Sequence, residues 1–180
     1  GLGDVYKRQD ISCVELMDSC IQRYEQVNHV VNAIVETNFE NALSVCRDLD
    51  NSLKQRLTDE MFLPIPIGIK DLNDVAGMKT TYGSPLFKDN QVKNDDDIVA
   101  HLKETSAIIF GKTNVPEHGF GATTTNPLQG STGNPFNPSL SAGASTGGGA
   151  AAVAASIVPL ATGSDFAGSL RTPAGFCGIA

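Results

Sequence analysis

One serine of this chain stands in a spacing typical of a catalytic nucleophile. Residues 143–147 read Gly-Ala-Ser-Thr-Gly, which satisfies the G-x-S-x-G pattern of the nucleophile elbow in α/β-hydrolases. A serine hydroxyl attacks a carbonyl carbon only when a neighbouring group removes its proton. The elbow also requires an apolar strand leading into the serine, whereas residues 134–139 read Asn-Pro-Phe-Asn-Pro-Ser, which predicts a loop. An α/β-hydrolase with Ser145 as nucleophile is therefore the less favoured interpretation.

Other short motifs fail on their context. Residues 111–113, Gly-Lys-Thr, resemble the end of a phosphate-binding P-loop, but the first glycine of that motif would fall at Ser106. The glycines at 147–149 do not form the G-x-G-x-x-G pattern of a dinucleotide site. The histidines lack the spacing of metal ligands: His29, His101 and His118. The sequence therefore predicts no metal and no cofactor.

The composition limits the class of partner. The 180 residues suit about one domain, and 13 Lys and Arg against 20 Asp and Glu give a net charge of −7. An acidic chain without a basic cluster is a poor ligand for nucleic acid or an anionic membrane. The longest apolar run, residues 150–161, is too short to span a bilayer. We expect a small-molecule substrate, with neither nucleic acid nor a membrane as partner.

The cysteines and the chain ends indicate the setting. No two cysteines form a C-x-x-C pair, and no signal peptide is visible, which favours a reducing, cytoplasmic location. Cys13 and Cys20 are seven residues apart, so on a helix they share one buried face. Residues 1–9 lack an initiator Met and fit no later pattern, which suggests a sequence-assembly scar. The chain stops in mid-pattern at Ala180, as a fragment would.

Helices and strands are expected to alternate along the chain. Ser12 and Glu15 form a capping-box pattern, and the apolar spacing that follows predicts a helix of about four turns. The further expectations are a helix over residues 39–53, strands over 64–69 and 107–110, a helix capped by Asp97 through residue 102, a helix over 147–155 and a strand over 157–161. Lys70 directly follows the first strand. This alternation predicts an α/β fold.

A long stretch of the chain carries no Lys, Arg, Asp or Glu. It runs over the 47 residues from His118 to Ser164 and holds nine Gly and twelve Ser or Thr. A flexible linker would have such a composition. The small-residue helix and the apolar strand expected inside it favour burial beside closely approaching backbone instead.

Three motifs within and around this stretch resemble the amidase signature family. Residues 68–71 read Gly-Ile-Lys-Asp, residues 141–148 read Ser-Ala-Gly-Ala-Ser-Thr-Gly-Gly, and residues 163–174 read Gly-Ser-Asp-Phe-Ala-Gly-Ser-Leu-Arg-Thr-Pro-Ala. Supporting matches are Gly-Lys-Thr-Asn-Val-Pro-Glu at 111–117 and Gly-Asn-Pro at 133–135. The motifs stand in the family's order, and the resemblance runs from about Ile11 to the last residue.

The resemblance implies amide hydrolysis by a Ser–cis-Ser–Lys triad. Ser169 is similar to the acylated nucleophile, Ser145 to the bridging serine that follows a cis peptide bond, and Lys70 to the base. The lysine can take a proton only when neutral, which requires burial or a nearby positive potential to lower its pKa from about 10.4. A bridging hydroxyl can donate and accept at once, so it can relay the proton.

The resemblance also implies supporting groups around the nucleophile. Backbone N–H groups would form an oxyanion hole at Phe166, Ala167, Gly168 and Ser169. Three side chains would support the site structurally: Thr146, Asp165 and Arg171. No metal and no cofactor belong to this mechanism.

The chain departs from the family's common patterns at several positions. The usual run Gly-Gly-Ser-Ser-Gly-Gly-Ser has Ala144, Thr146 and Gly149 in place of a Gly and two Ser. Ala167 replaces the first Gly of the oxyanion turn. The glutaminase component of glutamine-dependent tRNA amidotransferases, the alternative within the family, usually has Met-Asp-Glu-Phe where residues 115–118 read Val-Pro-Glu-His. This difference favours a stand-alone amidase of the EC 3.5.1 type acting on linear amides.

The resemblance implies a fold as well as a reaction. We expect an α/β fold with a mixed sheet covered by helices, preceded by an N-terminal helical segment. Residues 10–180 would form the N-terminal part of a single amidase signature domain whose C-terminal portion is missing, and such a fragment alone would be inactive. A homodimer is compatible with this interpretation.

Overall fold

The computed structural model describes residues 10–56 and 64–180; the suggested assembly scar, residues 1–9, lies outside them. The helices are α2 (Cys13–Val31), α3 (Phe39–Arg56), α4 (Asp97–Glu104), α5 (Gly147–Ala154) and α6 (Arg171–Cys177). The strands are β1 (Ile34–Thr37), β2 (Pro66–Lys70), β3 (Ile108–Thr113), β4 (Thr125–Asn126), β5 (Gly130–Ser131), β6 (Gly133–Asn134), β7 (Asn137–Ser141) and β8 (Leu160–Ala161). Two short turns are η1 (Pro85–Phe87) and η2 (Glu117–Gly119).

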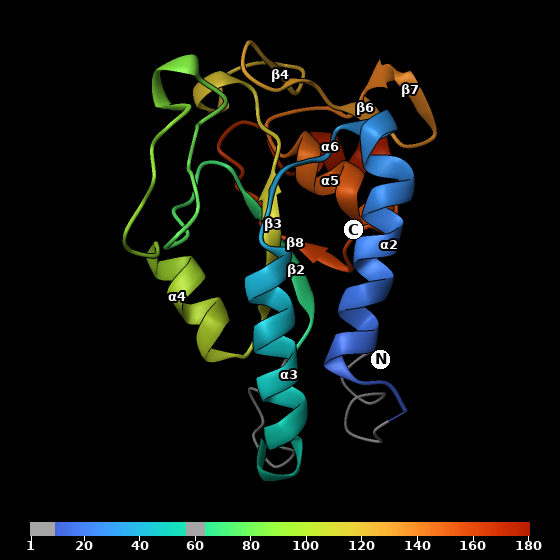
Figure 1. The fold of residues 1–180 in the computed structure, drawn as a ribbon. Coiled ribbons are helices and arrows are strands. Elements are labelled where there is room, and N and C mark those ends of the chain that lie inside the picture. Colours follow the sequence, from blue (N-terminus) through green and yellow to red (C-terminus); the bar gives the residue numbers. More distant parts are fainter. Residues whose placement is uncertain (1–9, 57–63) are drawn as a thin grey trace.

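A four-stranded sheet forms the centre of the molecule, with the strand order β1-β3-β2-β8 (Figure 1). β3, β2 and β8 run parallel, and β1 is antiparallel to β3. All residues of β2 and β3 are buried, as expected for strands covered on both faces. The expected mixed sheet with covering helices is confirmed.

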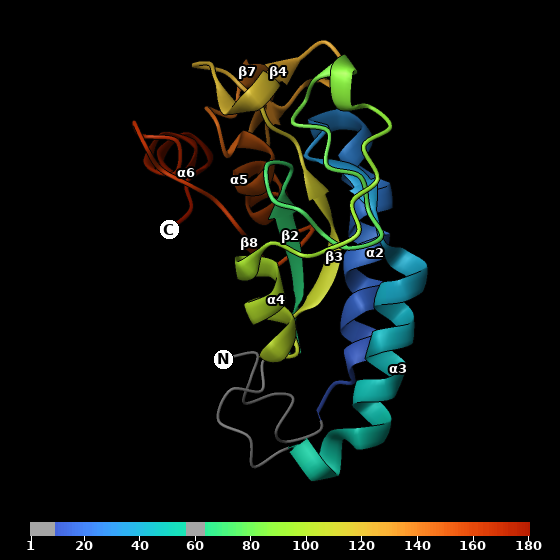
Figure 2. The same cartoon turned by 90° about the vertical axis from the view of Figure 1, so that its left-hand side faces the viewer.

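Two apolar clusters hold helices against this sheet. The larger joins α2, α3 and α5 to Ile108 and Phe110 of β3. The smaller sets Val99 of α4 against Ile67 and Ile109 on the other face. Figure 1 accordingly shows α4 and α2 on opposite sides of the sheet, and Figure 2 shows α2 and α3 lying side by side along their length.

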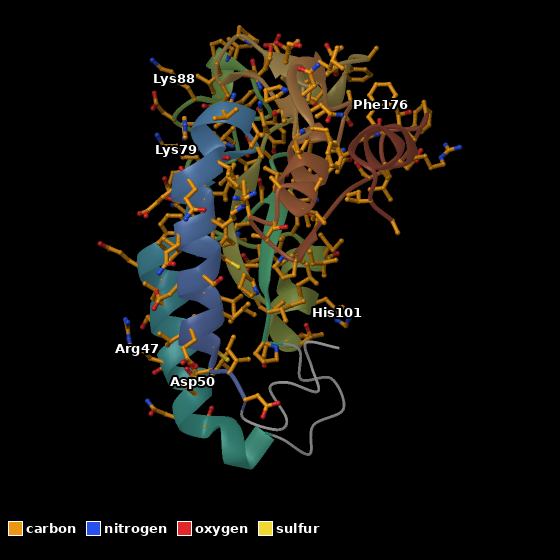
Figure 3. All side chains as sticks on the ribbon, turned by 90° about the vertical axis from the view of Figure 1, so that its right-hand side faces the viewer. Arg47, Asp50, Lys79, Lys88, His101 and Phe176 are labelled. Atoms are coloured by element: carbon orange, nitrogen blue, oxygen red, sulfur yellow. The ribbon has the colours of Figure 1, made fainter. Side chains whose placement is uncertain are left out.

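The start of α2 is held by its own cap and by a neighbouring helix. The Ser12 hydroxyl accepts from the Glu15 amide, and the Glu15 carboxylate accepts from the Ser12 amide, so the predicted capping box is present. Asp50 of α3 accepts from the amides of Cys13 and Val14 at 2.8 and 3.2 Å. Figure 3 shows Asp50 beside this end of α2. A carboxylate there satisfies amides that lack a helical partner and complements the helix dipole.

Several predicted boundaries need correction. Asp97 is the first residue of α4, and Asp96 occupies the cap position without a side-chain cap bond. The predicted strand over 157–161 is reduced to β8, although Ile157 and Val158 are buried. Residues 133–141 form the β6–β7 hairpin instead of a loop. β7 is largely exposed and pairs only with β6, so no core strand leads into Ser145 as an elbow requires.

The uncharged stretch is only partly buried. Residues 142–152 are buried throughout, as predicted, whereas most of residues 118–141 are exposed. Composition could not separate these halves, because Gly, Ser and Thr suit both exposed turns and close packing.

Lys112 is a buried structural cation in the middle of the sheet. Its ammonium nitrogen lies 3.0 Å from a carboxylate oxygen of Asp71, and it donates to the carbonyl oxygens of Asn73 and Lys79 and to the Thr80 hydroxyl. Gly111-Lys112-Thr113 therefore belongs to a strand, which confirms that it is no phosphate loop. Lys112 pairs with Ile69, the neighbour of Lys70, so Lys112 and Lys70 point to opposite faces of the sheet.

Replacing Gly148 by Ala is expected to destabilise the fold. A Cβ there would lie 2.3 Å from the Asn114 amide nitrogen and 2.5 Å from its carbonyl oxygen, so the backbone must shift. We expect a loss of about 1–3 kcal/mol in the free energy of unfolding, measured by thermal and denaturant unfolding. The matched control is Gly175→Ala in α6, where a Cβ meets no atom within 4 Å. Equal stability of the two variants would contradict this packing.

Candidate active site

Lys70 ends β2 with its amine buried among hydroxyl groups. The side chain is 1% exposed. Its Nζ lies 2.9 Å from Ser145 Oγ, 2.9 Å from Thr146 Oγ1 and 2.8 Å from Ser164 Oγ. Each of these partners can either donate or accept a hydrogen bond. The structure therefore brings Lys70, Ser145 and Thr146 together, as their predicted roles require.

Burial lowers the pKa of Lys70 from its usual value of 10.5 to about 8. Removing the amine from water disfavours the charged form, and the negative charge of Asp165 only partly opposes this. Near neutral pH a useful fraction of the amine is therefore uncharged, which is the form that can accept a proton.

The segment after β8 positions Lys70. Thr162 Oγ1 accepts from the Lys70 amide at 2.8 Å, and the Thr162 amide donates to the Gly68 carbonyl at 2.8 Å. This pairing carries the chain on to Ser164, whose hydroxyl completes the set around Nζ. Sequence reasoning assigned no role to Thr162 or Ser164. The signal available for Ser164 was its place in the third motif, directly before Asp165.

Ser145 stands immediately before the closely packed start of α5. The peptide bond between Ala144 and Ser145 is cis. On either side of it, Thr124 Oγ1 donates to the Gly143 carbonyl at 2.8 Å and accepts from the Gly147 amide at 3.2 Å. One buried threonine thus holds both ends of the turn that carries Ser145.

Ser169 lies in a second turn against the same segment. Its carbonyl oxygen accepts from the Thr146 amide at 3.1 Å. Its hydroxyl makes no hydrogen bond to any of the described residues, so the structure places Ser169 at the site without joining its hydroxyl to Ser145.

Asp165 and Arg171 organise the turn that carries Ser169. Asp165 accepts from the Gly168 amide at 2.7 Å and from Arg171 Nε and Nη2 at 2.9 and 3.0 Å. These bonds, the guanidinium first, hold the pKa of Asp165 well below its usual range. Of the four amides predicted for the oxyanion hole, that of Gly168 is thus occupied by Asp165. Within the described residues, those of Phe166, Ala167 and Ser169 have no acceptor.

A cavity of about 640 Å³ joins the two turns. Its polar lining includes the hydroxyls of Ser145, Ser164 and Ser169. The remaining wall is mostly apolar or small and comprises Leu72, His118, Gly119, Phe120, Gly121, Ala122, Ala144, Phe166, Ala167 and Thr172. This is room for a small ligand beside hydroxyls and unpaired amides.

Residues 10–56 and 64–180 contain no group of three or more His, Cys, Asp or Glu side chains placed to bind a metal ion. In the same part of the chain, no helix combines the length and apolar character needed to cross a bilayer.

Comparison with known proteins places this arrangement in a family. The model of the family described as Amidase matches residues 15–180. The chain belongs to the amidase signature family. An acylamidase of Rhodococcus erythropolis is 40% identical over 173 residues, covering 94% of this chain and 36% of the relative. The glutamyl-tRNA(Gln) amidotransferase component of Halalkalibacterium halodurans that belongs to this family is 36% identical over 181 residues, covering 99% and 37%.

Solved amidase signature structures share the fold of the chain. A bacterial aryl acylamidase superposes with a TM-score of 0.89 at 33% identity, covering 96% of this chain and 36% of that one. A 6-aminohexanoate cyclic dimer hydrolase superposes with a TM-score of 0.87 at 32% identity, covering 98% and 36%. The chain thus spans little more than a third of the length of these relatives.

The buried amine predicts a specific dependence of stability on pH. Because the folded-state pKa of Lys70 is about 8 and the usual value is 10.5, the unfolded chain binds more protons between these pH values. Stability from this group therefore rises with pH across that window, by roughly 3 kcal/mol in total, and is lost as pH falls toward 8.

Lys70→Met removes this titration. We expect the difference in unfolding free energy between the wild type and Lys70→Met to change by that amount from pH 8 to 10.5, measured by denaturant unfolding. Lys88→Met is the control, because the Lys88 side chain is 63% exposed. Parallel pH profiles for the wild type and Lys70→Met would show that the amine is not desolvated.

Proposed function

We propose that the protein containing this chain hydrolyses carboxylic amides to acid and ammonia or amine, through an acyl-enzyme on Ser169. The observation that carries the proposal is the Lys70 amine, which is buried, has a lowered pKa and lies 2.9 Å from Ser145 Oγ. Family membership and the adjacent cavity support the same reaction.

The proton moves along the three residues as the bonds change. Ser169 Oγ attacks the amide carbon and passes its proton to Ser145, whose own proton goes to the neutral Lys70 amine. The proton then returns through Ser145 to the leaving nitrogen as the C–N bond breaks. Water attacks the resulting ester by the same relay and restores the Ser169 hydroxyl. Thr146 and Ser164 keep the amine positioned throughout.

The negative charge on the carbonyl oxygen needs donors that are already in place. We assign this role to the amides of Phe166, Ala167 and Ser169, because the Gly168 amide donates to Asp165. Ala167 is not among the residues with positive φ, so its Cβ fits the turn where the family commonly has Gly. Asp165 and Arg171 are structural supports in this proposal.

The second candidate is the glutaminase component of a tRNA amidotransferase. It is favoured by relatives from glutamyl-tRNA(Gln) amidotransferases that are 34–38% identical over nearly the whole chain. It is disfavoured by Val-Pro-Glu-His at residues 115–118. Glutaminase activity that rises only when partner proteins are added would reverse this ranking.

The setting and assembly of the enzyme are part of the proposal. The four cysteines are free and buried, which supports a reducing, cytoplasmic location. We propose a small-molecule amide as the partner of the site, no nucleic-acid or membrane contact by this segment, and assembly no larger than a homodimer. We also expect the 180-residue chain alone to be inactive, so the activity experiments use the longer polypeptide that contains it.

Ser169→Ala is expected to abolish acyl-enzyme formation. A fluorophosphonate probe should form one covalent adduct with the wild type, and peptide mass spectrometry should locate it at Ser169. Ser139→Ala, an exposed hydroxyl on β7, is the control and should label normally. An adduct at Ser145 would instead support the elbow interpretation.

The rate of amide hydrolysis should depend on the neutral form of Lys70. Because the pKa of Lys70 is about 8, kcat/KM should increase with pH and level off above that value. Lys70→Ala should lower kcat by on the order of a hundredfold or more and remove this limb. An unchanged limb in Lys70→Ala would assign it to another group.

A further inference from the structure

The cavity beside Ser145 has one ionisable side chain in its wall, within the part of the chain that the structure describes. That residue is His118, which is exposed and lines the cavity. The other contributors from its own segment and from β2's following loop are apolar or lack a side chain: Leu72, Gly119, Phe120, Gly121 and Ala122. An imidazole there is the only hydrogen-bonding side chain apart from those of residues 144–172.

The backbone of His118 is held in an unusual conformation. His118 has φ 54° and ψ 19°, and Tyr82 also has a positive φ, 53°. The two are joined directly, since the His118 amide donates to the Tyr82 carbonyl at 2.7 Å. Left-handed non-glycine residues are uncommon and cluster at functional sites, where surrounding contacts enforce them.

Two aromatic rings fix the imidazole. It stacks on Tyr82 with ring centroids 6.5 Å apart and an interplanar angle of 23°, and it meets Phe87 edge-on at 5.9 Å and 88°. Tyr82 and Phe87 contact each other at 5.2 Å. A ring braced on two sides presents its N–H with little conformational freedom to lose on binding.

We propose that His118 is a specificity-determining residue, which donates a hydrogen bond to an acceptor on the substrate away from the scissile amide. The apolar wall formed by Leu72 and Phe120 suits a flat ring, so the favoured class is a carboxamide on an aromatic ring that carries an acceptor atom. An imidazole can donate in either charge state. The proposal rests on the proposed function for its choice of an amide ligand.

The test compares isosteric amides that differ in one ring atom. Benzamide has no ring acceptor, whereas picolinamide, nicotinamide and isonicotinamide place one nitrogen at successive ring positions. Binding to the Ser169→Ala form of the longer polypeptide is measured by calorimetry, so no turnover is needed. We expect at least one pyridine isomer to bind about tenfold more tightly than benzamide, in line with one added hydrogen bond.

His118→Phe keeps a ring for Tyr82 and Phe87 but removes the donor, and should bring this ratio close to one. His101→Phe, on α4 (Figure 3), is the matched control and should keep it. If His118→Phe fails to fold, His118→Asn replaces it, because Asn tolerates positive φ and its shorter amide should also lose the preference.

Three results would overturn the proposal: no pyridine isomer is preferred, the preference survives in the folded His118 variant, or none of the amides binds. Failure of the proposed function has a different signature. In that case the preference and its dependence on His118 remain, while the protein with Ser169 intact hydrolyses none of the four amides.

Discussion

The site depends on one interaction, the burial of the Lys70 amine among groups that accept either of its charge states. A neutral amine has two N–H donors and one lone pair, so it can donate to two hydroxyls and accept from a third. An ammonium can donate to all three. Ser145, Thr146 and Ser164 can rotate their hydroxyl hydrogens to suit either form. A proton can therefore arrive and leave without orphaning a buried polar atom, which would otherwise cost about 1–3 kcal/mol.

Lys112 shows the opposite solution one strand away. Its partners include two carbonyl oxygens and the Asp71 carboxylate, which only accept, so this amine must stay an ammonium. The sheet separates the two lysines, because they point to opposite faces. Asp71 follows Lys70 in sequence, yet its charge is used on the far side by Lys112. Two buried lysines thus differ in chemistry through their hydrogen-bond partners, with similar burial.

The sequence allowed the local features to be predicted and left the long-range ones open. The capping box at Ser12 and the strand ending at Lys70 follow from neighbouring residues, and the triad assignment followed from motif order. Thr162 and Ser164 were missed because their role appears only when β8 pairs with β2, more than ninety residues away in the chain. Likewise, composition could not show that Asp165 occupies the Gly168 amide, since that depends on how the turn closes.

The geometry also explains why two departures from the family's usual run occur together. Thr146 keeps the hydroxyl that the Lys70 amine contacts but adds a methyl group to the common Ser. A Cβ at Gly149 would lie 3.2 Å from that methyl carbon and 3.3 Å from the Ala161 Cβ, tighter than ordinary contact. A serine at 149 would thus crowd the methyl of Thr146, whereas glycine leaves it room. The pair conserves the polar contact to the amine while redistributing one carbon atom of packing, so neither change weakens the case for Lys70.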